Sequence, residues 1–111
     1  MYAVQYLDGS TPNDAESENP TPWETKPVGF GVADGIQIGG ELRIPLSEID
    51  GSPSAGSTLY VGFGKATTVR PTIAGFGSRI VGSILRIDGA WAVVEVRGQG
   101  RTIVLAQDAI P

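Results

Sequence analysis

The chain has 111 residues and a net charge of −4, and it contains 16 glycines and 8 prolines but no cysteine and no histidine. This length suffices for one domain with a modest core. The missing cysteine excludes disulfides and thiolate metal sites, and the missing histidine removes the commonest general base and metal ligand.

No apolar run is long enough for a transmembrane helix, and the first residues lack the basic and apolar regions of a signal peptide. We therefore expect synthesis in the cytoplasm and no membrane partner. Many glycines and prolines among residues rich in Val, Ile and Thr are typical of short strands joined by tight turns. The prediction is an all-β fold, a small β-barrel or sandwich of short antiparallel strands with a long extended N-terminal arm.

The beginning of the chain predicts one strand and then an arm. Residues 2–7 alternate enough to form a strand that ends at Asp8-Gly9. Residues 10–27 hold four prolines, four acids and one large apolar residue, Trp23, a composition that buries too little surface to fold alone. We therefore predict a strand and arm at residues 1–27 and a compact β-domain at residues 28–111. The arm is expected to lie on its own sheet, with Trp23 as anchor, or on a partner.

Several short strands follow in the compact part. The apolar runs between turn formers predict strands at residues 28–32, 36–38, 41–46, 59–63 and 67–73. In the third of these, Leu42, Ile44 and Leu46 share one face. Pro45 lacks an N–H donor, which predicts an edge strand or the end of one. Residues 47–57 are rich in turn formers and predict a surface loop.

The strongest local signal is the Asp88-Gly89 pair between two apolar runs, which predicts a β-hairpin. Pairing across this turn places Ile87 opposite Ala90, and the predicted core face is then almost wholly apolar: Val81, Ser83, Leu85, Ile87, Ala90, Ala92, Val94 and Val96. On the other face, Arg86 is expected to stack on Trp91 as a cation–π pair. Ile84 and Val93 on that face need cover from another element. A third strand is predicted after a loop at residues 97–101.

The titratable residues do not predict catalysis. The acids lie in the arm and in loops, and no rigid carboxylate pair is marked. Without histidine no ordinary Ser-His-Asp triad forms, and neither lysine lies in a recognised catalytic setting. The acidic run at residues 14–18 has alternating acids but lacks the rest of a calcium loop. We predict no catalytic, cofactor-binding or metal-binding residues, and no cofactor.

The charge is unevenly distributed along the chain. Residues 1–50 hold nine acids and two bases, whereas residues 51–111 hold three acids and six bases. The bases do not cluster and no run of stacking aromatics accompanies them, so we expect no nucleic-acid partner. The acidic and basic halves are suited to lie against each other, within one chain or between copies.

From residue 28 onward the order of strands and glycines resembles the small β-rich decoration, or cement, proteins of tailed-bacteriophage heads. The resemblance covers residues 28–97, through the segments GVADGI, GGELRIPL, GSTLYVG, GFGSRIVGSIL and AWAVVEV. It implies a non-enzymatic structural protein of the virion, made in the host cytoplasm. Such proteins bind the outside of the capsid, often as trimers, and stabilise contacts between shell subunits.

The resemblance also implies a partner and a mode of binding. The expected partner is the major capsid protein, bound by a homotrimer, with the N-terminal arm adding a strand to the capsid surface. Aromatic residues and arginine dominate interface energetics. The candidate contact residues are therefore Tyr2, Tyr6, Trp23, Arg97 and Arg101, although the two arginines are slightly better explained as solvated loop charges.

Two other functions fit the same residues. The first is a small carbohydrate- or peptide-binding β-module of a larger assembly, for example a phage tail or fibre component, with Trp23, Tyr60 and Trp91 as platforms. The second is an enzyme of unfamiliar type, which ranks last because histidine and cysteine are both absent.

Overall fold

In the computed structural model, the described residues are 2–12, 27–62, 64–70 and 79–98. They form an all-β fold, as the composition predicts. A three-stranded sheet contains β1 (Val4–Tyr6), β2 (Val28–Val32) and β3 (Gly35–Gln37), in that order. A six-stranded sheet has the order β4 (Gly39–Pro45), β9 (Trp91–Arg97), β8 (Ile80–Asp88), β6 (Thr58–Val61), β7 (Ala66–Thr67) and β5 (Ile49–Asp50).

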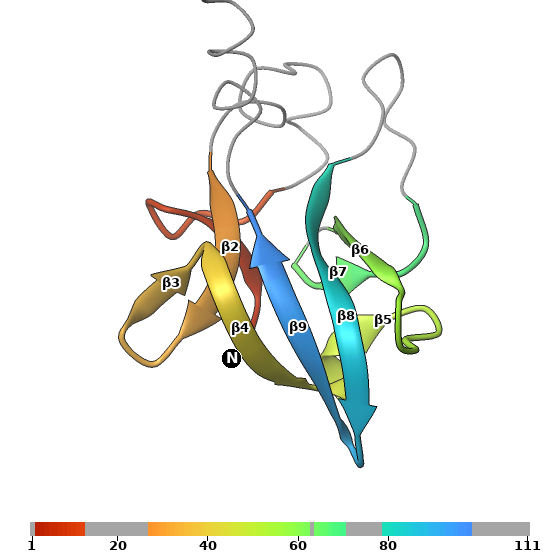
Figure 1. Cartoon of the computed structure of the whole chain (residues 1–111). Helices are drawn as coiled ribbons and strands as arrows, with labels where there is room; N and C mark the ends of the chain where they lie inside the picture. Colours follow the sequence, from red (N-terminus) through yellow and green to blue (C-terminus); the bar gives the residue numbers. More distant parts are fainter. Residues whose placement is uncertain (1, 13–26, 63, 71–78, 99–111) are drawn as a thin grey trace, which may run out of the picture.

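The larger sheet curls like half of a barrel, with the smaller sheet beside its opening (Figure 1). Backbone hydrogen bonds join the two sheets at both sides. Gly98, directly after β9, donates its N–H to the Ile38 carbonyl at 3.2 Å and accepts from the Val28 N–H. On the other side, the Val4 N–H donates to the Gly64 carbonyl at 3.2 Å. These contacts enclose one continuous core.

Apolar side chains from both sheets fill this core. Phe30, Ile44 and Leu59 are fully buried, and burying such a side chain contributes about 1.5–3 kcal/mol. The predicted face of β4 is confirmed, because Leu42 and Leu46 pack against the same cluster as Ile44. The remaining buried members of the cluster are Val4, Tyr6, Val28, Ile49, Val61, Ala66, Val81, Ile84, Ala92, Val94 and Val96.

Most predicted strands agree with the described ones, and one strand is added. The predicted strand at residues 67–73 is wrong over residues 68–70, because β7 is only Ala66–Thr67, and residues 71–73 lie outside the described part. Residues 28–32 form β2 as predicted, and β4 is an edge strand that ends at Pro45. The predicted loop at residues 47–57 is wrong at its start, where a 3-10 turn (Leu46–Glu48) leads into β5. Ile49 is buried there, and this burial pulls the short segment into parallel pairing with β7.

The first strand belongs to the core. β1 pairs antiparallel with β2, Val4 is fully buried and Tyr6 is 3% exposed. The predicted boundary at residue 27 stays a prediction, because residues 13–26, with Trp23, lie outside the described part. The predicted third strand after residues 97–101 also stays a prediction, because residues 99–111 lie outside the described part.

The predicted hairpin exists, but its register is different. The two-residue turn is Gly89-Ala90, and Asp88 pairs with Trp91. Gly89 has φ +63° and occupies the first turn position, where type II′ turns favour glycine. No described non-glycine residue has a positive φ, so the structure avoids placing Asp88 in the left-handed region that the predicted turn would require.

Two register shifts in β8 change which of its side chains face the core. The register with β9 shifts between Ile84 and Arg86, and that with β6 shifts so that Val81 is the extra residue. A bulge of one residue turns the following side chains over. Consequently Ile84 is buried with Val81, whereas Leu85 is 42% exposed. The prediction that Leu85 faces the core and Ile84 faces outward is therefore wrong. Ile87 lies opposite buried Ala92, on the predicted face, but it stands next to the turn and is 37% exposed.

Candidate interaction surface

The outer side of β4, β9 and β8 combines aromatic, apolar and charged side chains. We call it the hairpin face. Alternation along the strands and the observed pairing place these side chains there: Glu41, Arg43, Pro45, Ser83, Arg86, Asp88, Trp91, Val93, Glu95 and Arg97. The hairpin carries its tip away from the rest of the sheet, as Figure 1 shows.

Arg43 and Trp91 lie at the end of this face that is next to the hairpin turn. The Arg43 guanidinium carbon lies 5.5 Å from the centroid of the Trp91 ring. Its Nη2 also lies 3.5 Å from Asp88 Oδ2, with both side chains more than half exposed. The predicted stacking of Arg86 on Trp91 is wrong, because the register places Arg86 opposite Val93. The cation over the indole comes from β4 instead.

The charges of the hairpin face lie in rows across the strands. Arg43, Val93 and Arg86 form a basic row with a buried valine between the arginines. The next row contains Glu41 directly opposite Glu95. Like charges directly opposite each other destabilise a sheet. Part of this repulsion is relieved by Arg97, whose Nη2 donates to Glu95 Oε1 at 3.0 Å.

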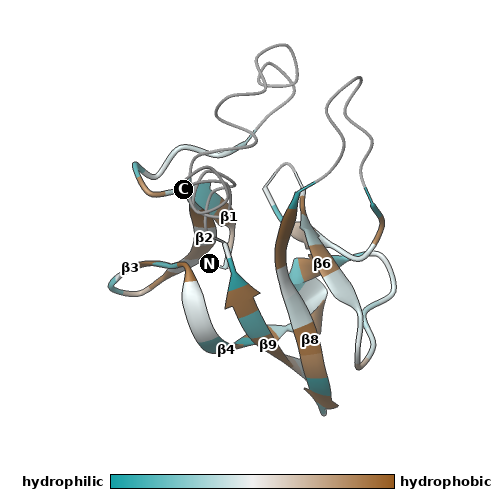
Figure 2. Cartoon of the chain, turned by 45° about the horizontal axis from the view of Figure 1, so that its top comes forward, coloured by the Kyte–Doolittle hydropathy of each residue, from teal (hydrophilic) through white to brown (hydrophobic). Residues whose placement is uncertain are grey.

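Apolar side chains surround the tip of the hairpin. Leu85, Ile87 and Trp91 are 42%, 37% and 37% exposed. Figure 2 shows hydrophobic and hydrophilic residues alternating down β8 and β9 to the tip. Trp91, Arg43 and Arg86 are of the types that are enriched in protein interfaces. The arrangement is suited to binding another macromolecule.

The predicted contact residues are not gathered in one place. Tyr6 is in the core, and Tyr2 packs against the core while its N–H donates to Glu48 Oε1 at 2.9 Å. This N–H lowers the pKa of Glu48 below its ordinary value of 4.5. Arg97 is exposed at the far end of the hairpin face. Trp23 and Arg101 lie outside the described residues.

The two described platforms of the carbohydrate-binding alternative lie far apart. Tyr60 pairs with Ile80 at one end of β8, and Trp91 pairs with Asp88 at the other. Eight residues of strand separate these positions by about 25 Å. Arg43 also lies over one face of the Trp91 ring, so that face is not open to a sugar.

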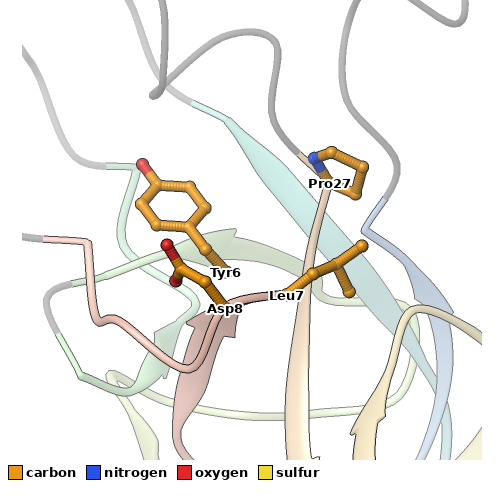
Figure 3. Close-up of a pocket in the computed structure, with 4 residues that line it drawn as sticks. All are labelled: Tyr6, Leu7, Asp8 and Pro27. Carbon is orange, nitrogen blue, oxygen red and sulfur yellow. The ribbon is translucent and has the colours of Figure 1, made fainter.

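A shallow pocket lies at the opposite end of the molecule, lined by Tyr6, Leu7, Asp8 and Pro27 (Figure 3). Asp8 Oδ1 accepts hydrogen bonds from the backbone N–H and the hydroxyl of Ser10. Nearby, Arg79 donates from Nη2 to the Gly98 carbonyl at 3.0 Å. Partial burial lowers the pKa of Arg79 to about 10, so it stays charged at neutral pH. The pocket offers an apolar wall and one carboxylate that is already bonded.

Sequence reasoning missed Arg43, Asp88, Leu85 and Ile87 as members of an exposed surface. The signal for Arg43 is its position at alternating spacing from Glu41 and Pro45 on an edge strand. For Leu85 no local signal exists, because a bulge is needed to expose it. Ile87 is exposed because it stands next to the turn, although it lies opposite buried Ala92.

Comparison of the chain with protein-family models, with curated proteins and with solved structures gave no match. Within the described residues there is no helix of the length and apolarity that crossing a membrane requires. The same residues contain no group of three or more acidic side chains placed to hold a metal ion.

Proposed function

We propose that this chain is a non-enzymatic structural protein that binds the outside of a viral capsid and stabilises contacts between shell subunits. The observation that carries the proposal is the Arg43–Trp91 pair beside the hairpin turn, together with the exposed Leu85 and Ile87 near the same tip. The likeness of residues 28–97 to phage head decoration proteins supports the choice of a capsid as the partner.

The hairpin face has the composition that such a role needs. Exposed tryptophan and arginine are the residues that most often anchor protein interfaces. Scattered apolar side chains on a protein surface need no explanation, but a set grouped at one projecting tip marks an interaction site. We propose that the tip fits between shell subunits and that the basic row, Arg43 and Arg86, meets acidic groups there.

In this proposal the arm is shorter than the expected residues 1–27, because β1 belongs to the core. Val4 and Tyr6 are core residues, so removing residues 1–27 would remove part of the core together with the arm. A test of arm binding must retain residues 1–12 and replace only residues 13–26 with a flexible Gly/Ser linker of equal length. The proposed partner remains the major capsid protein, bound by a homotrimer on the virion.

The first experiment is co-sedimentation of the purified chain with capsids from its own source, with bound copies counted. Saturable binding at a fixed ratio to the shell protein is expected, with copies in multiples of three. Trp91→Ala and Arg43→Ala should each weaken binding at least tenfold. The matched control is Val69→Ala, which removes an exposed apolar side chain (63% exposed) away from the hairpin face and should bind like the wild type.

Several results would overturn the proposal. One is a chain that stays in the supernatant as a folded monomer at every capsid concentration. Another is equal binding by the wild type, Trp91→Ala and Arg43→Ala, which would remove the hairpin face from the interface. Binding to a glycan array that disappears in Trp91→Ala would favour the carbohydrate-binding module instead.

A further inference from the structure

β4 is an edge strand whose free side is capped by a side chain. Hydrogen bonds at both ends of β4 show which of its residues bond to β9. The Ile38 carbonyl accepts from the Gly98 N–H, and the Leu46 N–H donates to the Ala90 carbonyl at 2.9 Å. In an antiparallel ladder, alternate residues bond to the same neighbour. The even-numbered residues of β4 therefore bond to β9, and the backbone groups of residues 39, 41, 43 and 45 point to the free edge.

The Gln37 side chain bonds to two of the four outward carbonyls of this edge. Its Nε2 donates to the Gly39 carbonyl at 2.8 Å and to the Glu41 carbonyl at 3.0 Å. Both carbonyls belong to the outward set. Pro45, at the other end, has no N–H to offer. Among the described residues of β4, Arg43 is then left with both an outward N–H and an outward carbonyl open.

The edge is complementary to itself when it is uncovered. Two copies of β4 can pair antiparallel about a twofold axis at Leu42, which places Glu41 of each copy opposite Arg43 of the other. Each Glu41–Arg43 pair is then a hydrogen-bonded pair that exchanges two backbone hydrogen bonds, and opposite charges directly across a ladder are favourable. In this pairing the Arg43 N–H donates to the Glu41 carbonyl of the second copy. That carbonyl is one of the two that Gln37 occupies.

We infer that Gln37 is an edge cap that prevents β4 from pairing with β4 of a second copy. Exposed strand edges promote association, and proteins block them with side chains, charges and proline. Here the Gln37 amide takes the place of a neighbouring strand. The cap and the second copy compete for the Glu41 carbonyl, so removal of the cap converts the edge into a dimer interface.

The test is analytical ultracentrifugation of the isolated chain, without capsids, over a wide concentration range. The wild type should show no association through this edge. Gln37→Ala should dimerise at least roughly tenfold more tightly than any wild-type association. Gln37→Leu, which keeps the bulk but loses both donors, serves as the second variant if Gln37→Ala fails to fold, and it should dimerise as well.

Charge reversal tests the register. Gln37→Ala combined with Arg43→Glu places Glu opposite Glu and should return the protein to monomer. Adding Glu41→Arg exchanges the charges and should restore the dimer. Amide hydrogen exchange supplies a second readout: the Arg43 amide should exchange fast in the wild type and slowly in the Gln37→Ala dimer, while the Val94 amide in the core stays protected in both.

Three results would overturn the inference. They are a folded Gln37→Ala that remains monomeric at all concentrations, a dimer that is insensitive to Arg43→Glu, and an Arg43 amide already protected in the wild type. None of them depends on capsid binding, so the failure of this inference and the failure of the proposed function are distinguishable.

Discussion

Arg43 of β4 lies over the indole ring of Trp91 of β9, with 5.5 Å between the guanidinium carbon and the ring centroid. The two residues are diagonal neighbours across one ladder, since Trp91 itself pairs with Pro45. Asp88 approaches the same guanidinium from β8. One arginine thereby links the outer sides of three strands.

The Arg43–Trp91 contact predicts a measurable coupling free energy between the two side chains. Exposed cation–π pairs contribute about 0.5–1 kcal/mol. A double-mutant cycle with Arg43→Ala and Trp91→Ala, followed by urea unfolding, should give a coupling free energy of that size. The same cycle with Arg86→Ala in place of Arg43→Ala is the control and should give about zero. A coupling that appears with Arg86 and not with Arg43 would restore the register first expected for the hairpin.

Ile84 and Ile87 lie on the same face of β8, opposite Val94 and Ala92, but they differ in burial. Ile84 is 1% exposed and Ile87 is 37% exposed. Ile84→Ala should lower the free energy of unfolding by about 2–5 kcal/mol, because it leaves a cavity in the core. Ile87→Ala should cost less than about 1 kcal/mol. Denaturant unfolding of both variants measures the difference, and equal costs would contradict the difference in burial between the two side chains.

The close packing of β9 against Gly82 predicts that a larger side chain at this position destabilises the protein. A Cβ at this position would lie 2.5 Å from the Glu95 carbonyl oxygen and 3.2 Å from Val94 Cγ1, so two strands would have to separate. Gly82→Ala should therefore destabilise the protein by about 1–3 kcal/mol, the usual range for overpacking. Gly39→Ala is the matched control on the edge strand β4 of the same sheet, because nothing lies within 4 Å of its Cβ position. Thermal unfolding that shifts equally for both variants would contradict the close approach at Gly82.

The hydrogen bond from Tyr2 to Glu48 predicts a contribution to stability that is lost toward acid pH. The Tyr2 N–H stabilises the carboxylate and lowers its pKa in the folded state below the ordinary 4.5. A group with a lowered folded pKa contributes stability that is present above its unfolded pKa and lost as the pH falls through its folded pKa. The wild type should therefore exceed Glu48→Gln in stability at neutral pH, and the gap should close below about pH 4.5. Unfolding free energies measured from pH 7 to pH 3 check this, and a gap that widens toward acid pH would refute it.

Local signals in the sequence predicted most of the strands. The period-2 alternation of Leu42, Ile44 and Leu46 identified the buried side of β4, and Pro45 identified its place at an edge. Turn chemistry located the hairpin to within one residue. These features succeed because each depends on a few neighbouring residues and on one face being buried.

The errors arose where the structure departs from regular alternation. A bulge shifts every later residue to the other face, and nothing in residues 80–88 marks the two shifts of β8 apart from Gly82. The Arg43–Trp91 pair depends on strand order, since β4 pairs with β9 from nearly fifty residues away. The Gln37 cap likewise depends on how β3 turns into β4, which composition does not specify.

The hydrogen bonds at Gly98 have a mechanical consequence. This single residue is bonded to Ile38 through its N–H, and to Val28 and Arg79 through its carbonyl. A stretching force applied to the chain after residue 98 would load these bonds together with the end of the β4–β9 ladder, in shear. A force applied at the hairpin tip would instead open the β8–β9 ladder one pair at a time. The molecule should therefore resist traction far better at the end where its two sheets meet than at the tip.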